Sequence, residues 1–239
     1  MTRAVDLTNP IFTDLDTARA HFEAIRWPDG PYCPFCGVMG NRVVPLGGKS
    51  MGPGWYHCKD CRKKFTAAVG SLYERSHIPL TKWFLATHLM CASKKAMSAH
   101  QLGRMLGLPY KTAWFMAHRI REGMREFNPT PMGGTGKTAE ADETFVGGRE
   151  KNKHAWQRDP KNIGGMGKEP VFSVVERGGK VRSQQHLKRY LGEFDFRYNE
   201  RIALGVTDAE RATKAIKGVV GKRLTYRSAD DGTADEIPF

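Results

Sequence analysis

The spacing of apolar residues predicts a short helix near the start of the chain. These residues recur at intervals of three or four positions, at Leu15, Ala18, Phe22 and Ile25, and therefore share one helix face. Thr13 is the expected N-cap, with Asp16 in the place that a capping box gives to glutamate. The helix is expected to end near Trp27, where a proline follows.

A second helical region begins at Ile78. Its first helix opens at Pro79 and carries a dense run of apolar side chains: Trp83, Phe84, Leu85, Leu89 and Met90. Ser98 and Gln101 form the capping box of the next helix. Gly107 ends that helix, and a third one starts near Tyr110. One face of the third helix is apolar, with Ala113, Ala117, Ile120 and Met124.

A second face of the third helix is rich in cations and aromatic rings. A short helix, a turn that contains glycine and a helix with a basic face are typical of a helix-turn-helix. The alternative is a plain helical bundle with a solvated charged face. We favour the first interpretation, and the candidate DNA-binding residues are Lys111, Thr112, Trp114, His118, Arg121 and Arg125.

Beyond residue 137 the pattern changes to extended segments. Residues 138–146 predict a partly buried strand that Gly147 ends in a turn, and two more strands are expected at 170–176 and 181–183. Helical spacing returns from Gln185 to Tyr198, and a last short helix is expected near 208–220. Before these strands, glycine and proline mark residues 128–137 as a linker.

Four of the five cysteines form two Cys-x-x-Cys pairs, Cys33 with Cys36 and Cys58 with Cys61, separated by 21 residues. This spacing is typical of a four-thiolate zinc site, in which no coordination position stays open, so the metal is expected to be structural. Two disulfides are disfavoured because the chain is expected to be cytosolic. Cys91 lies in a helical pattern and is expected to be an ordinary buried thiol.

The charge balance favours a polyanionic partner. The net charge is +13 and the sequence pI is about 9.7, which is most often a feature of proteins that bind nucleic acid. No stretch of eighteen apolar residues or secretory signal is seen. We therefore expect a cytoplasmic protein with no membrane partner.

The strand at 138–146 carries three carboxylates, Glu140, Asp142 and Glu143. Carboxylate oxygens are ligands that hard cations such as Mg²⁺ prefer. The alternative is an edge strand whose charges are only solvated. The strand by itself favours that alternative.

In this order, the elements resemble bacterial insertion-sequence transposases with an N-terminal zinc ribbon, a helix-turn-helix and a DDE-type catalytic domain of ribonuclease-H-like fold. The resemblance covers nearly the whole chain and is carried by blocks at 26–30, 33–37, 58–66, 140–148, 175–181, 186–199 and 221–227. It implies DNA transposition as the function. It also implies transposon-end DNA as the partner and a homo-oligomer on that DNA.

The resemblance makes Asp142 the first catalytic carboxylate. Transfer of a phosphodiester by this route uses two metal ions about 4 Å apart, Mg²⁺ or Mn²⁺, held by acids from several elements. The segment that would supply the other acids is missing between Ser183 and Gln184. Strand transfer is therefore expected to be lost through an internal deletion. Two alternatives remain: a non-enzymatic DNA-binding regulator, or an active transposase or nuclease whose site other acids complete.

These inferences predict an α+β, multidomain fold with a zinc ribbon, a helical helix-turn-helix region and a truncated ribonuclease-H-like mixed sheet followed by C-terminal helices. The expected divisions are an N-terminal helix (1–30), the ribbon (31–70), the helix-turn-helix (78–127), the linker (128–137), the catalytic remnant (138–183), C-terminal helices (184–227) and an acidic tail (228–239).

Overall fold

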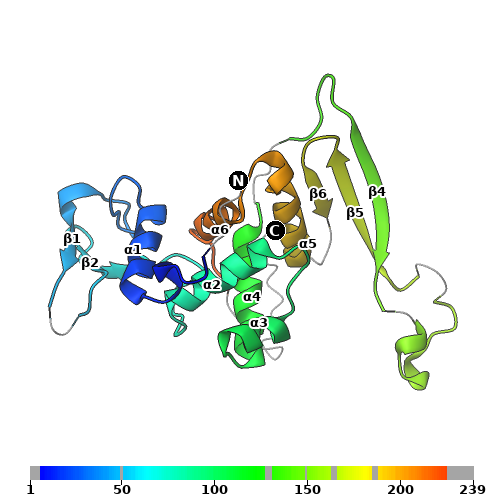
Figure 1. The fold of residues 1–239 in the computed structure, drawn as a ribbon, viewed down its shortest axis with the longest axis horizontal. Helices are drawn as coiled ribbons and strands as arrows, with labels where there is room; N and C mark the ends of the chain where they lie inside the picture. The colour runs from blue at the N-terminus through cyan, green and yellow to red at the C-terminus, as the bar shows by residue number, and fades with distance from the viewer. Residues whose placement is uncertain are drawn as a thin grey trace.

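The computed structural model describes residues 6–48, 51–126, 131–148, 150–162, 166–184 and 188–224. A small sheet lies at one end of the molecule, helices occupy the middle, and a second sheet lies at the other end (Figure 1). This confirms the predicted α+β class. Parts of the predicted linker (128–130), the predicted helix start at 185–187 and the acidic tail lie outside the described residues.

The first helix begins one residue later than its sequence suggests. Helix α1 spans Leu15–Arg26, and its N-cap is Asp14, whose carboxylate accepts a hydrogen bond from the Thr17 N–H at 2.7 Å. The prediction of Thr13 as the cap is therefore wrong. Thr13 instead ends a preceding 3-10 helix, because its N–H donates to the carbonyl of Pro10.

The first sheet is small and antiparallel. Its strands β1 (Val43–Leu46), β2 (Trp55–Cys58) and β3 (Lys64–Thr66) lie in that order. Between β3 and the helices the chain makes turns, and then enters α2 (Leu80–Ala92).

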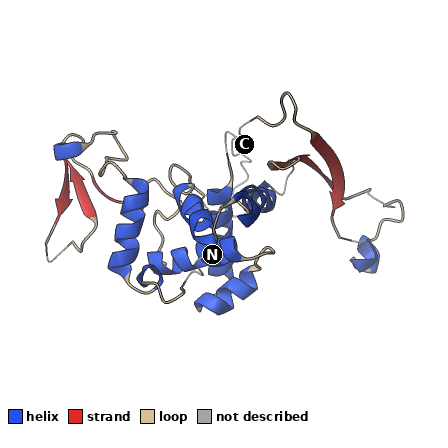
Figure 2. Cartoon of the chain, turned by 45° about the horizontal axis from the view of Figure 1, so that its top comes forward, coloured by secondary structure: helices blue, strands red, loops and turns tan. Residues whose placement is uncertain are grey.

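Helix α2 lies at the centre of the hydrophobic core, as its dense apolar run predicts. Its buried residues are distributed around the whole helix: Thr81, Trp83, Phe84, Ala86, Thr87, His88, Met90 and Cys91. A helix buried on all sides is surrounded by other elements. Around it lie α1, α3 (Ala99–Leu106), α4 (Tyr110–Met124) and α6 (Asp208–Lys217) (Figure 2).

The C-terminal helix α6 belongs to the same core as the N-terminal half of the chain. Its backbone comes so close to α4 that a Cβ atom on Gly218 would lie 2.1 Å from the carbonyl oxygen of Gly123. After α6, Val220 forms a β-bridge with Ser71, and the Gly221 N–H donates to Gly70. Residues far apart in sequence therefore complete one helical body.

The second sheet contains β4 (Ala139–Val146), β5 (Glu169–Glu176) and β6 (Val181–Gln184), in that order. All its pairings are antiparallel, so in the described residues the predicted mixed sheet is not formed. The tight turn at 177–180 reverses the chain between β5 and β6. Among the described residues no parallel strand follows β6, and the next element along the chain is α5 (Lys188–Asn199).

Helix α5 covers the outer edge of β6 with polar side chains. The Asp195 carboxylate accepts from the Ser183 N–H at 2.8 Å, and Asn199 exchanges two hydrogen bonds with the backbone of Val181. The opposite edge strand, β4, is exposed along its whole length. We expected β4 to be partly buried. It is not, because none of the described helices covers it.

None of the helices in the described part of the chain is both long enough and apolar enough to cross a membrane.

Candidate metal centre and nucleic-acid interface

The four predicted zinc ligands come together beside the first sheet, with Cys58 at the end of β2. The sulfur atoms of Cys33, Cys36, Cys58 and Cys61 all lie within 4.8 Å of one another, with Sγ–Sγ distances of 3.5 Å for Cys33–Cys61 and Cys36–Cys58. A tetrahedral zinc ion with Zn–S bonds of about 2.3 Å needs sulfurs about 3.8 Å apart. The cluster therefore has the dimensions of a structural zinc site.

Each cysteine pair sits on a tight turn. Gly37 and Arg62, which directly follow the two pairs, both have positive φ angles, of 77° and 58°. Only glycine adopts this conformation without strain, so Arg62 is held in it by its surroundings. The turns are closed by hydrogen bonds from Gly37 N–H to the Cys33 carbonyl and from Cys58 N–H to the Lys63 carbonyl.

The surroundings of Cys58 favour its thiolate form. Burial opposes ionisation, but the N–H groups of Cys61 and Asp60, together with the neighbouring thiols, lower the pKa of Cys58 to about 7. Thiolates are the form that binds metal. By contrast, burial raises the pKa of Cys91 to about 12, and this thiol is buried as predicted.

A residue that sequence reasoning did not single out joins the ribbon to α1. Arg26 is buried at the end of that helix and donates a hydrogen bond to the carbonyl of Ala67. Its guanidinium lies 5.4 Å from the ring centre of Trp27, and Trp27 in turn packs edge-on against Tyr56. The only signal in the sequence was its place in the matched block at 26–30.

The two helices α3 and α4 have the caps and turn that the sequence predicts. Ser98 accepts from the Gln101 N–H at 3.1 Å, and Gly107 ends α3 with a φ of 62°. A Cβ atom on Gly103 would lie 2.9 Å from the Leu108 carbonyl oxygen, so this glycine lets the turn approach α3 closely. The four predicted apolar positions of α4 are all buried.

The six candidate DNA-binding residues do not share one surface. Lys111 is exposed near the start of α4, and Thr112 and Trp114 are half-buried. Tyr110, next to Lys111, stacks on His100 of α3 with ring centres 4.1 Å apart. This stacking places exposed residues of α3 and of early α4 side by side.

Further along α4, the side chains of the predicted basic face point into the protein interior. Arg121 is 3% exposed, and its Nε donates to the Glu193 carboxylate of α5 at 2.6 Å. Its guanidinium also lies 4.5 Å from the ring centre of Tyr190. Arg125 is half-buried and bonds to Glu122 at 2.8 Å. Sequence spacing could not reveal this, because α5 comes from a distant part of the chain.

His118 lies in the same interface, 3.4 Å from the Tyr190 hydroxyl. Burial, followed by the charges of Arg121 and Arg189, lowers the pKa of His118 to about 4. The unfolded chain has a histidine pKa near 6.5. In the folded protein at neutral pH this histidine is therefore uncharged.

This pKa shift predicts a loss of stability in acid. Between pH 6.5 and about 4, His118 binds a proton more tightly in the unfolded chain than in the folded protein. The contribution of His118 to stability is therefore fully present above pH 6.5 and decreases as the pH falls. Urea unfolding at several pH values is expected to show a smaller decrease over this window in His118→Gln than in the original chain. Equal decreases in the two proteins would contradict a neutral, buried His118.

Asp142 stands on the exposed strand β4, opposite Ser173 of β5. Its carboxylate accepts a hydrogen bond from the Glu143 N–H at 2.9 Å. Glu140 pairs with Arg177 at 2.6 Å. In the described part of the chain, the four cysteines are the only group of three or more metal-binding side chains close enough to share an ion.

The other acids that could complete a site with Asp142 are either bonded elsewhere or placed away from it. Glu193 is 1% exposed and pairs with Arg121, and Asp195 is bonded to Ser183. Glu176 pairs with Lys137, which together with the Gly133 N–H lowers its pKa. Asp159 and Glu169 are exposed at the far end of the β4–β5 hairpin.

Comparison with known proteins gives two matches. The family model of the transposase zinc-ribbon domain matches residues 14–64. The chain is also 30% identical, over 179 residues, to an uncharacterized protein in transposable element ISH50 of Halobacterium salinarum, in a match that covers 71% of this chain. The chain spans 58% of the length of that relative. No solved structure matches the chain.

Proposed function

We propose that this chain binds transposon-end DNA but does not transfer strands. Its zinc ribbon and its insertion-element relative support its assignment to the transposase family. The observation that carries the proposal is a contrast. The four-cysteine cluster is complete, whereas Asp142 belongs to no group of three or more metal-binding side chains among the described residues. This contrast supports an intact DNA-binding part and an incomplete catalytic part.

DNA binding is assigned to the zinc ribbon and to the exposed surface of α3 and early α4. Lys111, Arg104 and Tyr110 are exposed on these two helices. Cations there would contact phosphates, which gives affinity without sequence preference, while aromatic and polar side chains would meet base edges. Arg121 is assigned a structural role instead, since it is buried against Glu193.

The loss of strand transfer is supported by the connection after β6. Helix α5 follows β6 almost directly and uses Asp195 and Asn199 to cover its edge. The residues that a second metal would need are therefore not supplied by this part of the fold. The C-terminal helices still pack on the helical core, which is consistent with a chain that folds in spite of the deletion.

Substitution of Lys111 tests the DNA-binding part. In Lys111→Ala, affinity for a duplex of the element's terminal inverted repeat is expected to fall, and the slope of log affinity against log salt to decrease by about 1, because one phosphate contact is lost. Lys217, exposed on α6, gives the matched control, and Lys217→Ala is expected to bind normally. Fluorescence anisotropy at several salt concentrations measures both. Equal binding by the Lys111→Ala variant and the original chain would contradict the assignment of this surface.

A further inference from the structure

A small structured knob projects from the second sheet. It is formed by residues 150–162, in the connection between β4 and β5, and contains two short 3-10 helices, Glu150–Asn152 and Ala155–Gln157. In Figure 1 it lies at the end of the hairpin, away from the helices of the core. We call this segment the β4–β5 knob.

Polar contacts hold the knob in one shape. The Glu150 carboxylate accepts from the Asp159 N–H at 2.8 Å and from the Lys153 ammonium at 3.0 Å. Arg158 donates to the carbonyls of Lys151 and Lys153, both at 3.0 Å. The knob is thus ordered by hydrogen bonds although it has no apolar core of its own.

The knob presents an aromatic ring to solvent. Trp156 is 82% exposed, more than any other large apolar side chain in the described part of the chain. The ring of His154 lies nearly parallel to it, with centres 6.5 Å apart. The indole of Trp156 makes no hydrogen bond that holds the knob together. Packing inside this chain therefore does not explain why a tryptophan occupies this position.

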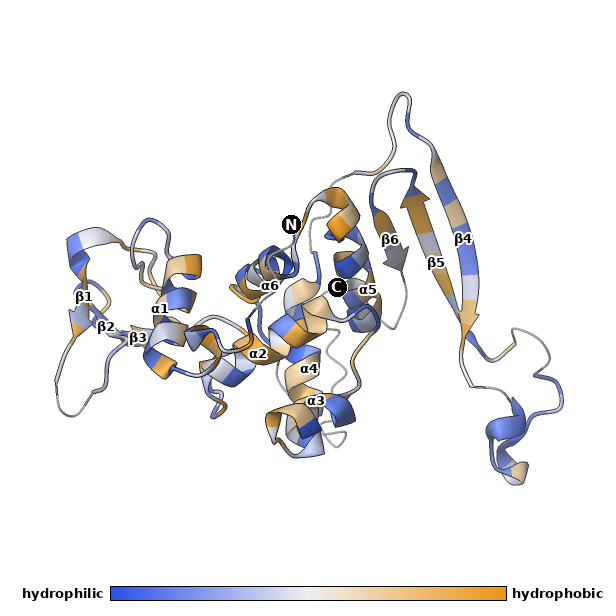
Figure 3. Ribbon diagram, viewed as in Figure 1, coloured by the Kyte–Doolittle hydropathy of each residue, from blue (hydrophilic) through white to orange (hydrophobic). Residues whose placement is uncertain are grey.

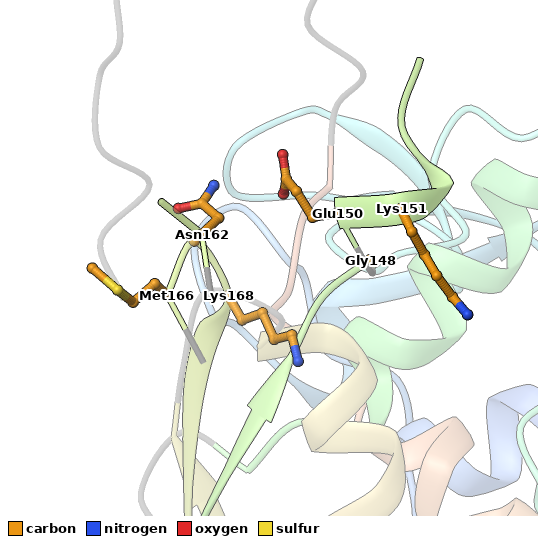
Figure 4. Close-up of a pocket in the computed structure, with 7 residues that line it drawn as sticks. Gly148, Glu150, Lys151, Asn162, Met166 and Lys168 are labelled. Atoms are coloured by element: carbon orange, nitrogen blue, oxygen red, sulfur yellow. The ribbon is translucent and has the colours of Figure 1, made fainter. Parts of the chain in front are cut away.

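The β4–β5 knob carries an excess of positive charge, because Lys151, Lys153, Arg158 and Lys161 outnumber the carboxylates of Glu150 and Asp159. Arg158 donates to carbonyls, and these contacts do not neutralise its charge. Figure 4 shows Lys151 and Lys168 at the pocket at the base of the knob, both pointing away from Glu150. In Figure 3 the knob is mostly hydrophilic.

We infer that the β4–β5 knob is a second DNA-binding element, in which Trp156 stacks on an unpaired base and the surrounding lysines contact phosphates. An exposed aromatic ring among cations is the chemistry that binds single-stranded nucleic acid. A protein partner would need a wider apolar patch around the indole, and the only other apolar residues of the knob are Ala155 and Pro160. The inference rests on the proposed function, because the partner is again DNA.

The test uses the full chain and a short oligothymidine strand as the probe. Trp156→Ala is expected to weaken binding of this strand about tenfold, because one stacked base is lost. Trp156→Phe keeps an aromatic ring and is expected to retain most of the affinity. Since Trp156 is largely exposed, neither substitution should unfold the chain. Tryptophan fluorescence gives a second readout, since the quenching caused by oligothymidine should be smaller in Trp156→Phe than in the original chain.

The outcomes separate this inference from the proposed function. If Trp156→Ala changes neither the affinity for oligothymidine nor the quenching, while Lys111→Ala still weakens duplex binding, the knob is not a DNA-binding element and the proposed function stands. If the original chain binds neither duplex nor single strand, the proposed function fails as well. If Trp156→Ala instead changes only self-association in gel filtration, the surface binds another copy of the chain and the inference is overturned.

Discussion

Removal of zinc is expected to unfold the small sheet formed by β1, β2 and β3. The sheet has strands of only three or four residues, and without the ion, four cysteine sulfurs within 4.8 Å of one another would have no common ligand. Structural zinc sites contribute about 10–16 kcal/mol of apparent binding free energy at pH 7. No other interaction in this part of the chain is expected to be as strong.

The effect can be measured with a chelator and with Cys58→Ser. Both are expected to remove one zinc ion per chain and to change the fluorescence of Trp27, which packs against Tyr56 and Phe65 of the sheet. Cys91 provides the control, because it is buried in α2 and is not part of the cluster. Cys91→Ala is expected to keep its zinc. A ribbon that stays folded with no bound metal would rule out a structural zinc site.

Loss of the Glu193 charge is expected to cause the second large change, a decrease in the free energy of unfolding. Glu193→Gln leaves Arg121 buried at 3% exposure without its counter-ion. Removal of one partner of a buried ion pair costs about 3–5 kcal/mol, chiefly because the remaining charge stays desolvated. Urea unfolding followed by circular dichroism measures this free energy. The double variant Arg121→Met with Glu193→Leu is expected to recover much of it, because neither charge is then buried.

An exposed pair on the same helical body gives the matched control for Glu193. Glu200 bonds to Lys214, and the side chains are 25% and 48% exposed. Exposed ion pairs contribute about 0–1 kcal/mol, so Glu200→Gln should have little effect. Equal losses of stability in Glu193→Gln and Glu200→Gln would mean that the interface between α4 and α5 does not hold the C-terminal helices in place.

Local signals in the sequence predicted the local features of this protein well. The two Cys-x-x-Cys pairs predicted the cluster, and Ser98 and Gly107 predicted the limits of α3. In each case residues close together in sequence fix the conformation through their own hydrogen bonds or backbone preferences. Thr13 is the exception, since a 3-10 helix just before α1 moves the cap to Asp14.

The positive charge of the chain was harder to interpret from the sequence. Several of its cations stabilise the fold instead of facing a partner. Arg211 is buried and donates to the Cys91 carbonyl at the end of α2, and Lys222 donates to the last carbonyls of α4. These contacts join residues about a hundred positions apart, so periodicity along the sequence could not predict them. The ion pair between Arg121 and Glu193 also joins residues distant in sequence, so periodicity could not predict it.

The position of Asp142 shows the other limit of sequence reasoning. The sequence predicted its strand, and the structure places it on β4 as expected. Burial of the strand was not predicted correctly, because it depends on whether a helix covers the sheet. The ribonuclease-H-like nature of this sheet and the deletion remain predictions.

The most direct measurement mixes the purified chain with its transposon-end DNA and Mg²⁺ or Mn²⁺, and follows binding and strand cleavage in the same samples. We predict a stable complex with the end DNA and no cleaved or joined product, both for the original chain and for Asp142→Asn. Metal-dependent cleavage by the original chain that Asp142→Asn abolishes would contradict the loss of catalysis and show that other acids complete the site.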